Sequence, residues 1–358
     1  MMCAVLEALE QRQLMAMGDM TAANVFGSWD AQDAGTSVAM DRAGNSYVTG
    51  YFYGSIDMDP SKKGVYLLKG DAKPAGFIAK YSPTGKLVWA KRMAGKGGVM
   101  PMQVKVGPTG DVFLAGTYDG PFGFQSKGRG LILADTNGGT DVFIIRLRGD
   151  GSLSWAGNVG GDDDDSYYGM DAGADGDVYL AGAFRLEGDL DPSRGVYPMV
   201  TQGVDDTYVL RVNGTTGKLT WAKVYGEDST SQPVSGLAAD GHGGVYVTGQ
   251  YFRTVGFDRE NSAFTMEGIG GQDIYLGHLV SNGGKTQSGA SWDWLMPIGG
   301  EEDEVAGGIA LGPTGDVYLT GSFGATTEFQ PGVASSALTS LGELDAFVAR
   351  YSSKGKLA

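Results

Sequence analysis

The chain has 358 residues, of which 42% are hydrophobic and 61 are glycine, and its formal net charge is -15 at neutral pH. The apolar content excludes a disordered chain, and the glycine content is typical of many short strands joined by tight turns. The negative charge disfavours binding to nucleic acid or to anionic membranes. The single cysteine, Cys3, excludes an internal disulfide framework and a multi-cysteine metal site.

Residues 1–20 do not have the pattern of a classical signal peptide, because no basic residue precedes their apolar part and acidic residues interrupt it. Residues 6–16 resemble the LEPR-XLL segment at the N-terminus of large bacterial surface proteins. Gln11 stands where that pattern has proline, and Met15 where it has a leucine. The resemblance implies export to the cell surface. The alternatives are a short amphipathic helix or a disordered segment.

A short strand motif recurs five times along the chain. Its copies are Asn45–Gly50, Asp111–Gly116, Asp177–Gly182, Gly244–Gly249 and Asp316–Gly321, at spacings of 66, 66, 67 and 72 residues. A glycine suited to the positive φ of a tight turn precedes each copy, and an apolar residue stands six positions before that glycine. The pattern predicts a hairpin, whose strands we call A and B.

A second hairpin, of strands C and D, is predicted about 25 residues later in each unit from alternating apolar and aromatic residues around a turn. Its complete copies run from Phe77 to Trp89, Val142 to Trp155, Thr207 to Trp221 and Ile274 to Trp294. The fifth copy, Phe347 to Ala358, stops before a strand D.

Four antiparallel strands repeated at a fixed period predict an all-β fold, a five-bladed β-propeller of four-stranded antiparallel blades. The predicted propeller covers residues 21–358, with units over about 35–95, 102–161, 168–227, 235–300 and 307–358. Asn24–Gly27 matches the end of a strand D, Lys223–Gly226. We therefore expect the N-terminal strand to complete the last blade and close the ring. The alternative is a piece of a longer array.

The units resemble the SBBP repeat, a bacterial β-propeller repeat, over about residues 25–358. In the first unit, Val38–Gly50, Asp57–Pro60, Phe77–Tyr81 and Trp89–Lys91 carry the resemblance. The family name implies seven blades, whereas five units are counted here. The resemblance also implies an extracytoplasmic location and no assigned enzymatic activity.

Because strands alternate in direction, the long B–C and D–A connections should share one face of the propeller, and long loops on a rigid scaffold often bind ligands. The acidic residues expected there are Asp162, Asp163, Asp164, Asp165, Glu301, Glu302, Asp303 and Glu304 on D–A connections, and Asp57, Asp59, Asp189 and Asp191 on B–C connections. Clustered carboxylates suit Ca²⁺. The alternatives are solvated loop charge and Asx turns before proline.

The sequence disfavours an enzyme, because its two histidines, His242 and His278, occupy a turn and a repeated strand C position. We expect a non-enzymatic extracytoplasmic or cell-surface propeller that binds a protein or glycan through the long-loop face, with Ca²⁺ as the candidate cofactor. One alternative is a glycan-binding or glycoside-cleaving propeller, with Trp29 and Trp292 as stacking platforms. The other is a purely structural envelope module.

Overall fold

The computed structural model describes residues 32–61, 64–124, 131–133, 138–226, 232–283 and 289–358. This part of the chain is all-β, apart from single 3-10 turns at Ser262–Phe264 and Ala334–Ser336. None of its helices is long and apolar enough to cross a membrane. The predicted segment 1–20 and the predicted closing strand Asn24–Gly27 lie outside the described residues.

Five successive units each contain the predicted strands A and B and strand C, and the first four also contain strand D. Strands A are β1 (Asp33–Met40), β7 (Val99–Val106), β13 (Ser166–Ala172), β17 (Val234–Ala239) and β23 (Val305–Leu311). Strands B are β2 (Ser46–Phe52), β8 (Val112–Tyr118), β14 (Val178–Asp189), β18 (Val245–Phe252) and β24 (Val317–Phe323). Strands C are β5 (Ala75–Tyr81), β11 (Asp141–Leu147), β15 (Pro198–Val212), β21 (Gln272–Ser281) and β27 (Asp345–Tyr351). Strands D are β6 (Leu87–Gly95), β12 (Leu153–Gly161), β16 (Leu219–Tyr225) and β22 (Ala290–Gly300).

The predicted hairpins are confirmed in register. Val38 faces Val48 across the first A–B pair, and Val104 faces Leu114 across the second. The A–B turn glycines adopt the left-handed conformation that the sequence predicts, with φ of 80° at Gly44. In the first four units strand C pairs on one side with strand B and on the other with strand D.

The B–C connections contain short strands that the sequence does not predict. They are β3 (Ser55–Asp57) with β4 (Leu67–Lys69), β9 (Phe122–Phe124) with β10 (Leu131–Leu133), β19 (Val255–Gly256) with β20 (Thr265–Met266), and β25 (Thr326–Glu328) with β26 (Ala337–Thr339). Three of these connections pair with strand D of the preceding unit: β9 with β6, the end of β14 with β12, and β25 with β22. Neighbouring units are therefore joined by backbone hydrogen bonds as well as by packing.

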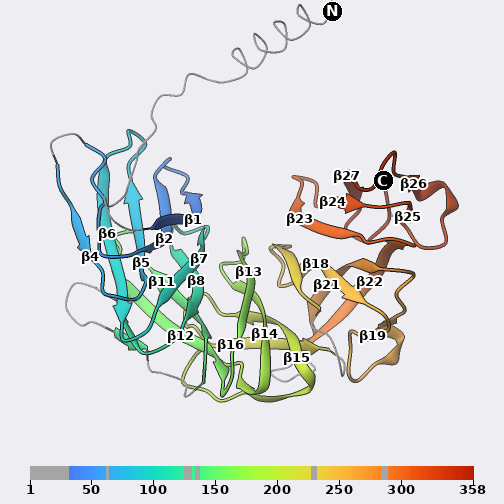
Figure 1. Ribbon diagram of the computed structural model, residues 1–358, viewed down its shortest axis with the longest axis horizontal. Helices are drawn as coiled ribbons and strands as arrows, with labels where there is room; N and C mark the ends of the chain where they lie inside the picture. Colours follow the sequence, from blue (N-terminus) through green and yellow to red (C-terminus); the bar gives the residue numbers. More distant parts are fainter. Residues whose placement is uncertain (1–31, 62–63, 125–130, 134–137, 227–231, 284–288) are drawn as a thin grey trace, which may run out of the picture.

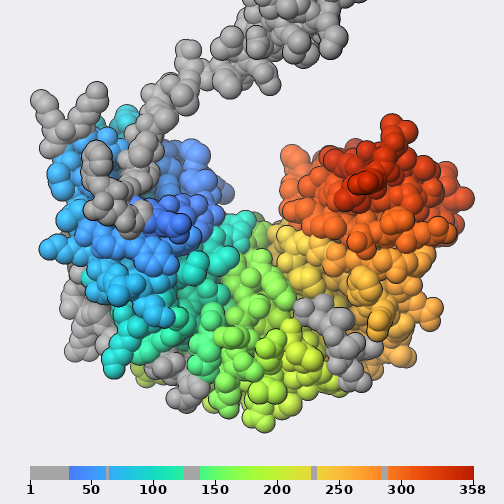
Figure 2. Space-filling view, in the orientation of Figure 1, coloured from blue at the N-terminus to red at the C-terminus, as the bar shows by residue number. Residues whose placement is uncertain are grey.

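The five units follow one another along an arc (Figure 1), with each strand A beside strand A of the next unit. The core fills the spaces between neighbouring sheets. In the first such space, Tyr47 and Ile78 pack with Val104 and Leu114 of the next unit. Open space separates the first unit from the fifth (Figure 2). The described residues thus form an open arc of propeller-like blades, and the predicted ring closure is not shown.

Candidate functional site

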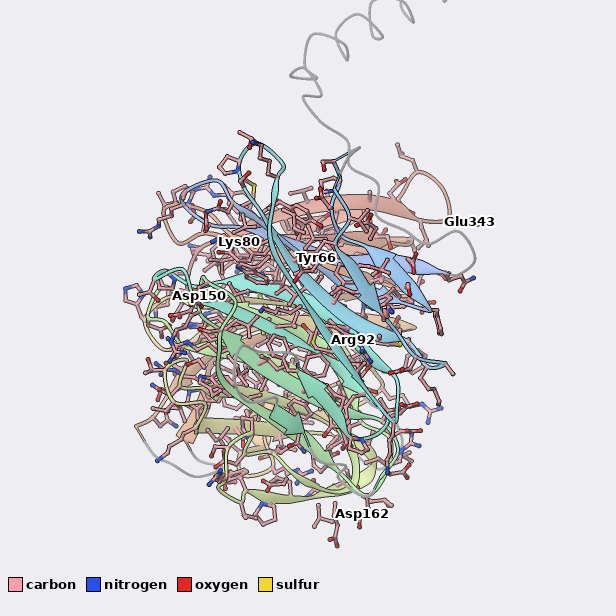
Figure 3. All side chains as sticks on the ribbon, turned by 90° about the vertical axis from the view of Figure 1, so that its left-hand side faces the viewer. Tyr66, Lys80, Arg92, Asp150, Asp162 and Glu343 are labelled. Atoms are coloured by element: carbon pink, nitrogen blue, oxygen red, sulfur yellow. The ribbon has the colours of Figure 1, made fainter. Side chains whose placement is uncertain are left out.

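The two predicted faces exist for the turns and for the D–A connections. The C–D turns and the D–A connections join opposite ends of the antiparallel strands. Figure 3 shows Asp150, in a C–D turn, at the left edge of the molecule and Asp162, in a D–A connection, at its lower end. Glu343, near the end of the last B–C connection, lies at the right edge, away from Asp150. We call the side that carries Asp162 the D–A face.

The tips of two B–C connections do not lie on the D–A face, contrary to the prediction that these loops share it. The backbone N–H of Leu219, at the start of β16, donates to Asp191 Oδ1 over 3.4 Å. Asp59 lines a surface pocket together with the C–D turn residues 84–87. The chain folds back along the outer strand after β3 and β14, which brings Asp59 and Asp191 to the C–D turns.

The predicted B–C acids form Asx turns, the alternative considered from the sequence. Asp57 Oδ1 accepts from the N–H of Asp59 at 3.0 Å and of Tyr66 at 2.8 Å. Asp189 Oδ1 accepts from the N–H of Asp191 at 3.0 Å and from that of Tyr197 at 2.8 Å. These carboxylates hold the loop backbone in shape.

In each unit one side chain lies between the two positions that Asp57 and Asp59 occupy in the first unit, and this side chain fixes the B–C connection more than the acids do. The five equivalent side chains are large, apolar and no more than 2% exposed: Met58, Phe124, Leu190, Phe257 and Phe329. They anchor the B–C connections in the core. The sequence does not predict them, because the alternation of polar and apolar residues around them spans too few positions to be recognised as a strand.

The D–A acids repeat one arrangement in two units. The third acid of each run accepts from the backbone where strand C begins: Thr140 N to Asp164 Oδ1 at 2.7 Å, and Gln272 N to Asp303 Oδ1 at 2.8 Å. The fourth acid of each run, Asp165 or Glu304, is buried. Asp164 and Asp303 are thus exposed but bound to the backbone, whereas Asp165 and Glu304 are buried.

Burial, partly offset by backbone hydrogen bonds from Gly161 and Arg185, raises the pKa of Asp165 to about 7, and the neighbouring Asp141 adds to the rise. Burial likewise raises the pKa of Glu304 to about 7, against hydrogen bonds from Thr327 and Gly300. Both groups therefore titrate near neutral pH.

Asp162, Glu301 and Glu302 remain as exposed acids on the D–A face. They make no hydrogen bond or ion pair with the described residues, whereas Asp163 accepts from the N–H of Asp164 at 2.8 Å. Within the described ranges, no three His, Cys, Asp or Glu side chains gather as metal ligands would. Calcium binding therefore stays a prediction from the sequence.

The opposite face carries the repeated strand C cation, which pairs with an acid of the A–B turn in its own unit. The pairs include Lys80–Asp41 at 3.6 Å, Arg146–Asp111 at 2.7 Å and Arg350–Asp316 at 2.8 Å. His278 occupies this position in the fourth unit, 3.1 Å from Asp240, and it stacks on Tyr246 with ring centroids 4.2 Å apart. Burial opposes ionisation of Asp240, but hydrogen bonds from His278 and two backbone N–H groups lower its pKa to about 2. The repeated position thus has the predicted packing and ion-pair role, but its acid comes from the same unit and not, as the sequence predicts, from the neighbouring one.

Trp292 does not offer a stacking platform, contrary to the glycan hypothesis. Its side chain is 3% exposed, and its Nε1 donates to the Phe257 carbonyl over 2.9 Å. Trp29 lies outside the described residues. His242 is exposed in its turn, with Nδ1 2.9 Å from the Asp240 carbonyl oxygen.

No protein-family model matches the chain, and no curated protein matches it either. Among solved structures, a puromycin hydrolase S511A mutant aligns with 11% identity and a TM-score of 0.36, covering 92% of this chain and 46% of that one. A glucose dehydrogenase aligns with 13% identity and a TM-score of 0.29, covering 83% and 96%. The intramolecular trans-sialidase from Ruminococcus gnavus aligns with 9% identity and a TM-score of 0.25, covering 91% and 96%. These similarities are to propeller-containing enzymes, and they are distant.

Proposed function

We propose that this chain is a non-enzymatic propeller outside the cytoplasm or at the cell surface that binds a basic partner protein through the D–A face. The location rests on the resemblance of residues 6–16 and of the repeat units to extracytoplasmic bacterial proteins. The partner class rests on charge, because a net charge of -15 attracts basic surfaces and repels phosphates.

One observation carries the proposal: Asp162, Glu301 and Glu302 are exposed acids of the D–A connections that have no partner among the described residues. The other predicted acids accept hydrogen bonds from backbone N–H groups or lie buried where two units meet. Uncompensated charge of one sign raises the local potential and the rate of encounter with an oppositely charged surface.

The test is binding of the full chain to immobilised poly-L-lysine, used as a generic basic probe. We expect Asp162→Asn with Glu301→Gln to weaken binding several-fold at low salt, because the D–A face loses two of its charges. Biolayer interferometry across a salt series measures the change.

The matched control removes the same number of charges elsewhere, at the exposed residues Asp150 and Glu260. We expect Asp150→Asn with Glu260→Gln to change the affinity less than twofold. Equal losses in the two double variants would mean that the probe responds only to net charge, and would contradict a binding role for the D–A face.

The proposal includes a closed five-bladed ring, and the two ends of the arc supply its support. Val348 of β27 is 77% exposed, whereas its counterparts Ile78, Ile144, Val209 and Leu276 are all 0% exposed. At the other end Val38 of β1 is 65% exposed, whereas its counterpart Val104 is 1% exposed. Because Ile78 and Val104 pack together in the first joint, the two open faces are complementary halves of one repeated interface.

The edges of the terminal sheets are open in the same complementary way. Within the described part of the chain, β27 pairs along its length with β24 and meets the following segment only at the Tyr351–Leu357 bridge, and β3 pairs only with β4. At three other places where neighbouring units meet, which we call joints, one strand D pairs both with strand C of its own unit and with the B–C connection of the next unit. In sequence, residues 24–27 match the end of a strand D, residues 223–226. The distance to the next strand A also matches. Eight positions separate Gly27 from Gly35, and eight separate Gly226 from Val234, which is the counterpart of Gly35 in the fourth unit.

Closure predicts that cysteines at Val38 and Val348 form a disulfide within one molecule. In a Cys3→Ser background, we expect Val38→Cys with Val348→Cys to crosslink under mild oxidation within the monomer, with the loss of two hydrogen atoms and no dimer formed. Mass spectrometry and non-reducing electrophoresis measure the product. Val38→Cys with Leu341→Cys is the control, because Leu341 is 98% exposed and lies in a connection.

A product consisting only of crosslinked dimers or larger species would show that the end faces meet between molecules. The absence of any crosslink would show that the arc stays open. Either result contradicts the closed ring without bearing on the poly-L-lysine test of the D–A face.

A further inference from the structure

A groove of about 910 Å³ opens at the second joint, where the second and third units meet. Strand D of the second unit forms one wall, and the B–C connection and the C–D turn of the third unit form the others. The groove is lined by residues 155–158, residues 191–195, Thr216 and Lys218. Its volume is within the roughly 300–1,000 Å³ of sites for small molecules, so an ion alone would not fill it.

The same place in the third joint is filled by two long side chains. Along strand D, Lys223 corresponds to Gly157, and in the B–C connection Arg259 corresponds to Pro192. Lys223 Nζ lies 2.7 Å from Asp258 Oδ2, and the cavity that remains there is about 20 Å³. The second joint has short residues at both positions, and its groove is open for this reason.

The strand D glycine also leaves an aspartate of the B–C connection without a lysine. A Cβ atom on Gly157 would collide with the Pro192 carbonyl oxygen, so the connection lies directly on strand D. Asp191 therefore has no counterpart of the Lys223–Asp258 ion pair of the third joint. Its Oδ1 accepts from backbone N–H groups, whereas its Oδ2 receives no hydrogen bond from the described residues.

Arg194 and Lys218 bring two positive charges to the groove, one from the B–C connection and one from the C–D turn. Both side chains are exposed, and neither forms a hydrogen bond or an ion pair within the described ranges. The side-chain amide of Asn158, on the strand D wall, likewise has no partner among the residues that the structure describes. A local excess of positive charge favours an anionic group of a ligand at this place.

The first unit repeats part of this arrangement. Asp59 and Lys86 line a groove of about 480 Å³, as Asp191 and Lys218 line the groove of the second joint. The repeat thus brings together an aspartate of the B–C connection and a lysine of the C–D turn in two units. The second joint adds Arg194 and the wall formed by strand D.

We propose that the groove of the second joint binds an acidic carbohydrate, a chain that contains uronic acid residues. Arg194 and Lys218 hold the carboxylate of one uronic acid by charge-assisted hydrogen bonds, and a ring hydroxyl donates to Asp191 Oδ2. The Asn158 amide bonds to a further hydroxyl group. This site lies beside a C–D turn and uses none of the exposed D–A acids, so it is independent of the proposed basic partner.

The mixture of groups in the groove favours a uronic acid over other anions. A sulfate or phosphate ion is too small for the groove and supplies no hydroxyl hydrogens to Asp191. An acidic peptide supplies carboxylates but few hydroxyl groups, and a second carboxylate near Asp191 would be repelled. A uronic acid carries one carboxylate and several hydroxyl groups on the same rigid ring, which suits both the cations and the free carboxylate oxygen.

The test is isothermal titration calorimetry of the full chain with a hyaluronan tetrasaccharide, which alternates glucuronic acid with N-acetylglucosamine. We expect saturable binding. Chitotetraose, which has the same number of rings and no carboxylate, and hexaglutamate, which has carboxylates and no sugar hydroxyls, should bind at least tenfold more weakly.

Arg194→Met with Lys218→Met should weaken binding of the tetrasaccharide by roughly tenfold or more, because charge-assisted hydrogen bonds are lost. Both side chains are exposed, so the variant should fold. The matched control is Lys356→Met, which removes an exposed lysine from the same turn position in the fifth unit. We expect that change to alter the affinity less than twofold.

The indole N–H signal of Trp155 gives a second readout on the wild-type chain by NMR. Trp155 lines the groove, and its Nε1 donates to the Gly214 carbonyl over 2.9 Å. We expect this signal to shift during the titration, whereas that of its counterpart Trp221, which is 1% exposed in the third joint, should not.

Three results would overturn the proposal: no saturable binding of the tetrasaccharide, equally tight binding of hexaglutamate, or binding that leaves the Trp155 signal unmoved. Equal losses from the double variant and from Lys356→Met would overturn it as well, since binding would then depend on net charge. None of these outcomes bears on the poly-L-lysine test, because no D–A acid is changed.

Discussion

Replacing Phe257 by alanine is expected to destabilise the fold by about 3–5 kcal/mol, the usual cost of removing a large buried aromatic ring. The side chain is 0% exposed. Its ring centroid lies 5.2 Å from that of Tyr225 in the third unit and 4.8 Å from that of Tyr275 in the fourth. The Phe257 ring therefore fills the joint between two sheets, and the remaining side chains cannot close the resulting cavity without moving a strand.

The matched control is Phe252→Ala, because Phe252 lies five residues earlier in the same unit and is 41% exposed. We expect that change to cost less than about 1.5 kcal/mol, and Phe257→Leu, which keeps an apolar side chain, to fall between the two. Urea unfolding followed by tryptophan fluorescence measures all three. Equal losses from Phe257→Ala and Phe252→Ala would contradict an anchoring role for the B–C connection.

The strands could be predicted from the sequence because their signals are local. The glycine before each strand B and the alternation within that strand lie inside one short motif, and similar copies of this motif recur, the first three at a spacing of 66 residues. The structure reproduces the predicted A–B and C–D hairpins, including the shortened fifth unit. Local pattern thus sufficed wherever the pairing partner is the next strand along the chain.

The contacts between neighbouring units could not be predicted in the same way, because the residues that meet there come from distant parts of the sequence. β9 is three residues long and pairs with β6, whose contacting residues stand about 30 positions earlier. The sequence predicts a site at Asp57 and Asp59 because they are acids, whereas the residue that fixes the connection is the buried Met58 between them. A short strand beside a turn-forming aspartate leaves too few residues for its periodicity to be recognised.

The candidate site shows the same limit. Four consecutive acids in one connection predict a cluster of carboxylates. In the structure these side chains have different surroundings. Asp162 is exposed, Asp164 caps the backbone before strand C, and Asp165 turns inward to Asp141. Composition gives the number of charges, whereas only the fold determines which of them remain available to a partner.

Replacing Arg259 by methionine is expected to destabilise the fold by about 3–5 kcal/mol, because it leaves Asp206 as a buried acid without its cation. Asp206 is 0% exposed, and Arg259 Nη2 forms an ion pair with its Oδ2. Arg259 Nη1 also donates to the Val200 carbonyl over 3.3 Å. Arg194→Met is the control, because Arg194 is exposed and forms no ion pair with the described residues.

This arginine lies where the third and fourth units meet. It supplies the positive charge opposite the buried Asp206 carboxylate. Without Arg259, burial should keep the pKa of Asp206 raised, so the variant's stability should fall more steeply with rising pH than that of the wild type. Adding Asp206→Asn to Arg259→Met should recover part of the lost stability and remove the extra pH dependence. If Arg259→Met instead matched Arg194→Met in denaturant midpoint and in its pH profile, the buried ion pair would have no part in holding the third and fourth units together.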